Sequence, residues 1–75
     1  MNMSKFQFVI CVDNSEYPSS LEVRKIYELV PDADAEKQGY FRIVDESGED
    51  YLYGSDRFVR VSLPKSVAAA VIRAA

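Results

Sequence analysis

Residues 38–64 carry the pattern that most restricts the fold of this chain. Apolar and aromatic residues alternate with polar ones on both sides of Ser47-Gly48, a pair that favours tight turns. A second break, at residues 54–57, is followed by one more alternating run, which Pro64 ends. This pattern predicts a β-hairpin, a short 3₁₀-like corner and a further strand, an arrangement typical of a small barrel.

The register of the hairpin depends on the geometry of its turn. A two-residue turn at Ser47-Gly48 pairs Ile43 with Leu52 and Arg42 with Tyr53. A three-residue turn with a glycine bulge shifts the pairing by one, which moves the side chains of one strand to the opposite face. We favour the first register because it joins two aliphatic residues and keeps Arg42 outward.

The size of the chain limits how its fold is stabilised. Seventy-five residues make one small domain, which buries only roughly 60% of the surface that its unfolded chain exposes. One cysteine and no histidine exclude an internal disulfide and give no basis for a zinc site. Hydrophobic residues make up 48% of the chain, which supports a packed core and argues against disorder. Packing must therefore stabilise the fold, alone or with self-association.

Two strands and a polar connection are predicted before the hairpin. Residues 6–12 alternate as a strand, and Cys11 is expected to be a small buried hydrophobic residue. Residues 21–30 fit either an amphipathic helix or a strand from about Arg24 onward, and the proline that follows favours the strand. Residues 32–39 predict a single helical turn with an aspartate cap and a glycine exit.

The C-terminal residues 64–75 predict a short helix, because Pro64 and Ser66 favour helix starts and the alanines favour helix. A helix of this length is marginal by itself in water. It is expected to dock on the barrel or on another chain, and fraying is the third alternative. The chain is thus divided into a barrel, residues 1–63, and a helix, residues 64–75.

The predicted core collects the apolar side chains assigned to the inner faces of these strands. They are Phe8, Ile10, Tyr27, Leu29, Phe41, Ile43, Leu52, Val59 and Val61.

Three segments resemble the SH3-like barrel family. Residues 21–30 resemble its second strand and the preceding turn, where those domains often have glycine at the position of Arg24. Residues 40–43 resemble its third strand, and residues 53–59 its one-turn corner, with Gly54 and Ser55 where a proline is expected. The whole chain is also similar to a group of small uncharacterised bacterial proteins with the same hairpin and corner. The resemblance covers about residues 6–63 and implies a mainly β, five-stranded SH3-like barrel with a short C-terminal helix.

The resemblance also implies where a partner would bind. Peptide-binding SH3 domains pack extended proline-rich peptides on an aromatic shelf between the first long loop, the third strand and the corner. This chain has Tyr40 where those domains prefer tryptophan, and it contains no Trp, which argues against proline recognition. As alternatives, Tyr17 folds back as a lid, and the C-terminal helix covers the hairpin tyrosines. The predicted partner-facing residues are Tyr17, Tyr40, Arg42, Tyr53 and Arg57.

The function predicted from these features is a small non-catalytic interaction module with a tyrosine-rich binding face. Its acidic surroundings favour a basic protein partner, and a homodimer is one form of this hypothesis. The alternative is RNA or single-stranded nucleic-acid binding through Arg42, Arg57 and Arg60 with neighbouring aromatic rings. The formal charge of −3 opposes this alternative, and these arginines are equally able to pair with nearby carboxylates.

Catalysis, metals and membranes are not expected. The sequence has no histidine, no phosphate-binding loop and no metal-ligand cluster, so neither an enzyme nor a cofactor site is predicted. The acidic residues 45–50 lack the spacing of a calcium loop. No apolar run approaches the roughly 18 residues of a membrane span, and the first residues lack the pattern of a secretory signal. A single unpaired cysteine suits a reducing compartment, so a cytoplasmic location is expected.

Overall fold

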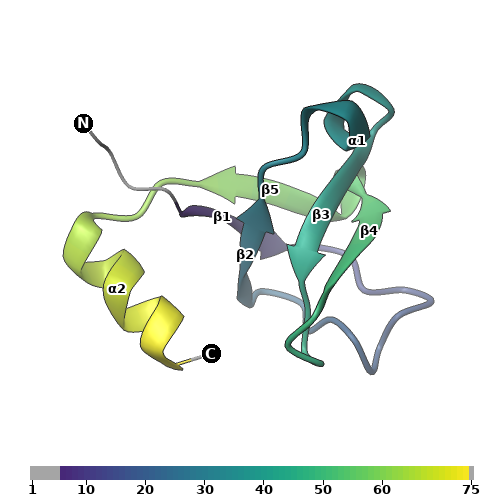
Figure 1. Ribbon diagram of the computed structural model, residues 1–75. Coiled ribbons are helices and arrows are strands. Elements are labelled where there is room, and N and C mark those ends of the chain that lie inside the picture. Colours follow the sequence, from purple (N-terminus) through teal and green to yellow (C-terminus); the bar gives the residue numbers. More distant parts are fainter. Residues whose placement is uncertain (1–5, 75) are drawn as a thin grey trace.

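The computed structural model describes residues 6–74 and contains five strands and three helices (Figure 1). Their bounds are β1 Gln7–Cys11, β2 Ile26–Val30, α1 Ala33–Lys37, β3 Tyr40–Val44, β4 Asp50–Gly54, the 3₁₀-helix η1 Ser55–Arg57, β5 Phe58–Val61 and α2 Lys65–Ala74. The mainly β class with a C-terminal helix is confirmed. The predicted barrel, residues 1–63, and the predicted helix, residues 64–75, include residues 1–5 and Ala75, which lie outside the described residues.

All five strands belong to one antiparallel sheet with the order β4-β3-β2-β1-β5. Within the described residues, no ladder joins the two edge strands β4 and β5, which are linked in sequence by η1. The sheet curves so that the Phe58 ring of β5 lies 6.2 Å from the Tyr53 ring of β4 and 6.4 Å from the Phe41 ring of β3. The concave inner face therefore encloses the core.

The core on this inner face agrees only partly with the predicted one. Tyr27, Leu29 and Ile43 are buried as predicted, and Phe41 packs against them. Leu21, from the loop between β1 and β2, was not predicted and is almost fully buried. The buried residues of the cluster are Val9, Cys11, Leu21, Tyr27, Leu29, Ile43, Tyr53 and Phe58.

The predicted inner faces of β1 and β5 are wrong. Val9 and Cys11 enter the core in place of Ile10, which is half-buried on the outer face. On β5, Phe58 is in the core whereas Val59 is 53% exposed. Both strands carry apolar residues on both sides, so alternation alone does not identify the inner face.

The other predicted core residues on the outer face differ in outcome. Phe8 is buried as predicted, on the outer face with its ladder partners Glu28 and Val61, whereas Val61 is only half-buried. Leu52 is exposed on β4 because the hairpin has a different register from the predicted one.

The hairpin has the three-residue turn, so the favoured register is wrong by one residue. Ile43 pairs with Tyr51, and Phe41 pairs with Tyr53. The Asp45 N–H donates to the Glu49 carbonyl at 3.1 Å, and Gly48 has a φ of +86°, which glycine adopts readily. The shift turns Tyr53 inward, where it is 6% exposed.

Local backbone preferences explain the helical turn after β2 and the bend before β2. Asp32 caps α1 by accepting the Ala35 N–H at 3.0 Å, and Gly39 leaves the helix with a φ of +86°, as predicted. The second strand begins at Ile26 rather than at Arg24, because Arg24 has a φ of +72° and makes the bend that leads into β2.

The C-terminal helix α2 lies beside β1 and β2, on the side of the sheet opposite to β4 (Figure 1). Ala68 is 5% exposed, Val71 and Ile72 are half-buried, and Val67 is exposed. The helix thus docks on its own sheet and does not cover the hairpin tyrosines. None of the helices among residues 6–74 has the length and apolarity needed to cross a membrane.

Candidate functional site

The loop between β1 and β2, residues 12–25, positions Tyr17 above the sheet. The Tyr17 N–H donates to the Asn14 carbonyl at 2.9 Å, and the Leu21 N–H donates to the Tyr17 carbonyl at 3.0 Å. The Asn14 side-chain amide also donates to the Leu21 carbonyl at 3.0 Å, and the buried Leu21 side chain anchors the loop in the core. The loop therefore holds Tyr17 in a defined place.

Arg57 of η1 fastens this loop to the sheet. Its guanidinium lies 4.8 Å from the centre of the Tyr17 ring, a cation–π contact. Its Nη1 donates to the Ser15 carbonyl at 2.5 Å, and its Nη2 lies 3.2 Å from the Glu16 carboxylate. The guanidinium is thus engaged on three sides and holds Tyr17 in place.

Tyr53 forms the floor beneath Tyr17. The two rings meet edge to face, with their centroids 5.0 Å apart, and the Tyr53 hydroxyl donates to the buried Asp45 carboxylate at 2.6 Å. Burial and this hydrogen bond raise the pKa of Tyr53 to about 12. Burial alone would raise the pKa of Asp45, but hydrogen bonds from Ser47 and Tyr53 outweigh it and lower that pKa. Tyr53 is therefore a largely buried residue beneath Tyr17, and its predicted partner-facing role stays a prediction.

A hollow of about 440 Å³ opens beside Tyr17, and we call it the tyrosine hollow. Its second wall is Tyr51, which is 49% exposed and whose hydroxyl donates to Glu49 at 2.9 Å. This hydrogen bond raises the pKa of Tyr51. The lining residues are Tyr17, Ser20, Asp45, Ser47, Tyr51, Leu52 and Tyr53.

The tip of the β3–β4 hairpin, which lines part of this hollow, is hydrogen-bonded to the loop between β1 and β2. The Glu46 N–H donates to the Ser20 carbonyl at 3.0 Å. The Glu46 carboxylate accepts from the Tyr27 hydroxyl at 2.5 Å and from Lys25 Nζ at 2.6 Å. The pKa of Glu46 is lowered by Lys25 first and by Tyr27 second. The two walls of the tyrosine hollow therefore belong to one connected structure.

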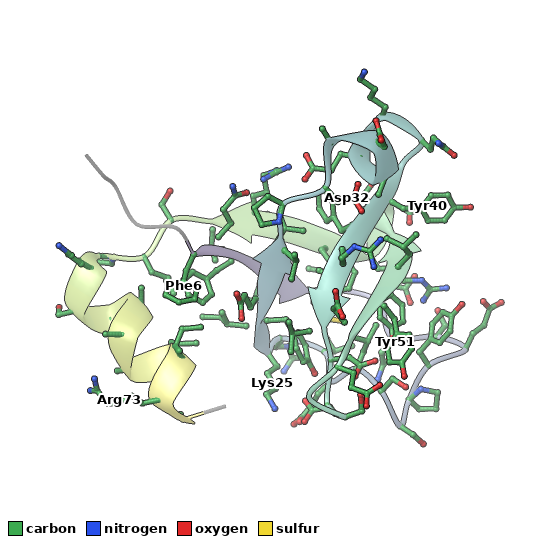
Figure 2. The ribbon with its side chains drawn as sticks, viewed as in Figure 1. Phe6, Lys25, Asp32, Tyr40, Tyr51 and Arg73 are labelled. Atoms are coloured by element: carbon green, nitrogen blue, oxygen red, sulfur yellow. The ribbon has the colours of Figure 1, made fainter. Side chains whose placement is uncertain are left out.

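Tyr40 and Arg42 lie apart from this hollow. Tyr40 pairs with Gly54 at the end of the β3–β4 hairpin opposite to Tyr51, as the labelled side chains in Figure 2 show. Arg42 lies on the outer face and donates to Asp32 at 2.9 and 3.0 Å. Of the predicted partner-facing residues, the structure brings together Tyr17, Tyr53 and Arg57, and it separates Tyr40 and Arg42 from them.

The sequence analysis missed Tyr51 and Leu52 as residues of this hollow. Both positions follow from the hairpin register, and the signal for the correct register was present in the sequence. Ser47 and Gly48 stand two and three residues after Asp45. The Asp45 carboxylate accepts from the Ser47 N–H at 2.9 Å and from the Ser47 hydroxyl at 2.6 Å. An aspartate two residues before such a serine favours this local turn.

The surroundings of the tyrosine hollow are acidic. Two exposed carboxylates, Glu16 and Asp13, lie at the Arg57 side, and Arg57 offsets part of their charge. Glu49 and Asp50 are exposed beside Tyr51 in the hairpin. A cationic partner would therefore meet an attractive potential at this surface.

The arginines proposed for nucleic-acid binding are all engaged with carboxylates. Arg42 pairs with Asp32, and Arg57 with Glu16. Arg60 Nη2 lies 2.8 Å from Glu36, and its guanidinium stacks 4.9 Å from the centre of the Phe41 ring. The alternative in which these arginines pair within the chain is the one observed.

The remaining chemistry of the described chain is sparse. Cys11 is fully buried in the core. Across residues 6–74, no three side chains of histidine, cysteine, aspartate or glutamate gather in a way that would hold a metal ion.

Comparison of the chain with protein-family models, with curated protein sequences and with solved structures gave no match.

Proposed function

We propose that this protein is a small non-catalytic interaction module that binds a basic segment of a partner protein at the tyrosine hollow. The observation that carries the proposal is the pair of half-exposed rings, Tyr17 and Tyr51, held on either side of a hollow and surrounded by carboxylates. Tyrosines of this kind are enriched at the centres of protein interfaces.

The rigidity of both tyrosines supports this function. Tyr17 is fixed between the Arg57 guanidinium and the Tyr53 ring, and Tyr51 is oriented by Glu49. A partner would not have to order these side chains on binding, and such ordering costs roughly 0.5–1.5 kcal/mol for each flexible side chain. Their contact area would therefore contribute almost fully to the affinity.

The proposal includes an SH3-like barrel in a cytoplasmic protein, of the small bacterial kind that the sequence resembles. It is supported by the strand order, by the curvature that brings Phe58 against Tyr53, and by the one-turn corner η1 between β4 and β5. In SH3-like domains the first long loop forms one side of the binding surface, and here that loop carries Tyr17. The reduced, buried Cys11 is consistent with a cytoplasmic location.

The test is a selection of displayed random 12-residue peptides on the immobilised protein, followed by fluorescence-anisotropy titration of the enriched peptides. We expect peptides rich in lysine and arginine, whose affinity falls as salt is added. Tyr51→Ala should weaken binding by more than about 10-fold, as expected for an interface centre. Tyr40→Ala is the matched control, because Tyr40 has similar exposure, 46%, but lies outside the tyrosine hollow.

The proposal is wrong if no peptide is enriched, if the enriched peptides are acidic, or if they bind Tyr51→Ala as tightly as the wild type. Tyr53→Ala is unsuitable as a probe of binding, because it removes a core side chain.

A further inference from the structure

A second concave surface lies on the opposite face of the sheet, between α2 and the strands β2 and β3. It has a volume of about 630 Å³, and we call it the helix groove. Its apolar walls are Phe8 and Ile26 from the sheet, Val44 from β3, and Val71 and Ile72 from α2. Figure 2 shows this side of the molecule, with Lys25 at the base of β2 and Arg73 on α2 pointing outward.

Glu28 stands in the middle of this apolar surface. It is half-buried on β2, and its two ladder neighbours on the same face are Phe8 and Val44. Within residues 6–74, its carboxylate has no hydrogen bond and no ion pair. Burial raises the pKa of Glu28, which reflects the cost of an ionised carboxylate among apolar groups.

The other charged side chains of the helix groove do not compensate Glu28. Lys25 is already paired with Glu46 at 2.6 Å. Asp45 points to the inner face, where it accepts from Tyr53. Arg24 lines the groove, but within the described chain no ion pair joins it to Glu28. Among residues 6–74, the lining thus contains two cations and three carboxylates, of which Arg24 and Glu28 have no ion pair. Arg24 is exposed, whereas Glu28 is half-buried among the apolar walls.

We propose that the helix groove is a second docking surface, for a partner segment in which a lysine or arginine is flanked by aliphatic side chains. The cation pairs with Glu28, and the aliphatic groups contact the walls formed by Phe8, Val44 and Ile72. Because Glu28 has no ion pair within residues 6–74, this apolar surface favours an apolar segment with one cation over a purely apolar one. The two surfaces share Asp45, but Glu28, Val44 and Ile72 line the helix groove and not the tyrosine hollow, so binding at these residues tests this proposal apart from the first.

The experiment is a titration of the ¹⁵N-labelled protein with n-butylguanidinium, followed by two-dimensional amide NMR, with 1-pentanol as the uncharged probe. We expect butylguanidinium to shift the amides of Glu28, Val44 and Ile72 in a saturable way, and pentanol to shift them much less. Glu28→Gln should weaken butylguanidinium binding by about fivefold, the scale of one partly exposed ion pair. Glu22→Gln, an equal change of charge at an exposed loop position, should leave it unchanged.

Four outcomes of the titration would overturn the proposal. They are equal binding by Glu28→Gln and wild type, equal shifts with pentanol, shifts confined to the tyrosine hollow, and a large gain in binding on Arg24→Ala. The last would mean that Arg24 already occupies the groove in solution. A dimer seen by light scattering and abolished by Glu28→Gln would also overturn it, because the occupant would then be a second copy of this chain.

Discussion

At the scale of single residues, the Tyr53–Asp45 pair links stability to the candidate site. Asp45 is buried at the start of the hairpin turn, and its carboxylate is satisfied by Tyr53 and Ser47. A buried carboxylate that loses a donor is costly, because no water replaces the donor. The same hydroxyl also fixes the ring against which Tyr17 packs.

Tyr53→Phe should therefore lower the free energy of unfolding by about 1–3 kcal/mol, as for a lost hydrogen bond to a buried charged group. Urea denaturation followed by circular dichroism measures it. Tyr51→Phe is the control, since its hydroxyl donates to the exposed Glu49, and it should change stability by less than about 0.5 kcal/mol. Equal effects of the two changes would show that Asp45 does not depend on Tyr53.

Arg24 has a backbone conformation that favours glycine. Its φ of +72° is a conformation that costs a residue with a β-carbon roughly 1–2 kcal/mol, whereas glycine adopts it freely. A glycine at this position would therefore relieve backbone strain.

Arg24→Gly should raise the free energy of unfolding by about 0.5–1 kcal/mol, after the larger entropy of glycine in the unfolded chain is counted. Arg24→Ala keeps the β-carbon and should not stabilise. Thermal unfolding of both variants tests this, and a stabilisation shared by alanine and glycine would point to the charge of Arg24 instead of its backbone.

At the scale of elements, the sequence predicted the strands, the corner and both α-helices but not which faces they bury. β1 carries apolar residues on both faces because Val9 and Cys11 enter the core, whereas Phe8 on the other face lines the concave surfaces beside α2. Alternation of apolar and polar residues identifies the buried face of a strand only when the other face is polar. The inner face is therefore fixed by tertiary pairing, here Cys11 with Phe58, which no local pattern reveals.

The docking of α2 depends on Ala68, the most buried residue of the helix. Ala68→Asp should release α2, because the small site cannot accept a charged side chain without burying it. Amide hydrogen exchange should then be faster in α2 and at Phe8, and unchanged at Ile43 and Tyr53. Ala69→Asp, an equal loss of helix propensity at an exposed position, is the control. Equal exchange in both variants would mean that packing at Ala68 does not hold the helix.

At the scale of the whole molecule, several carboxylates link folding to pH. The pKa of Asp32 is lowered by the Ala35 N–H and then by Arg42, and that of Asp13 by Ser15. The pKa of Asp45 and that of Glu46 are also lowered. Such groups bind more protons when the chain unfolds, so their contribution is complete above the ordinary values of 3.8 for aspartate and 4.5 for glutamate. It is lost as the pH falls through the lowered pKa values.

We therefore expect the urea midpoint to fall steeply from pH 5 to about pH 2, with Asp45→Asn flattening this dependence. Glu28 acts in the opposite direction, because its pKa is raised and its ionised form is the unfavourable one. Glu28→Gln should raise the midpoint at pH 7 and leave it nearly unchanged at pH 3. A Glu28→Gln effect that is equal at both pH values would exclude a cost of ionisation.

Part of the candidate site could be predicted, because the sequence shows where aromatic residues and loops occur. The sequence does not show which of these residues lie side by side in the folded protein. Tyr17 was identified from its place in a polar loop. The one-residue difference in hairpin register places both Tyr51 and Tyr53 on the face of Phe41 and Ile43. Tyr53 is buried there, whereas Tyr51, nearer the turn, is exposed. The helix groove could not be predicted from the sequence, because residues of β2, β3 and α2 meet there only after folding.

The pairing of β1 with β5 also governs when this fold can form. Phe8 of the first strand pairs with Val61 of the last strand, so this contact joins residues far apart in sequence. The β3–β4 hairpin, by contrast, joins neighbouring strands. During synthesis the hairpin can form while β1 still lacks one of its neighbours. Residues up to Val61 must therefore leave the ribosome before β5 can complete the sheet, and a nascent chain that stalls before Val61 leaves one edge of β1 unpaired.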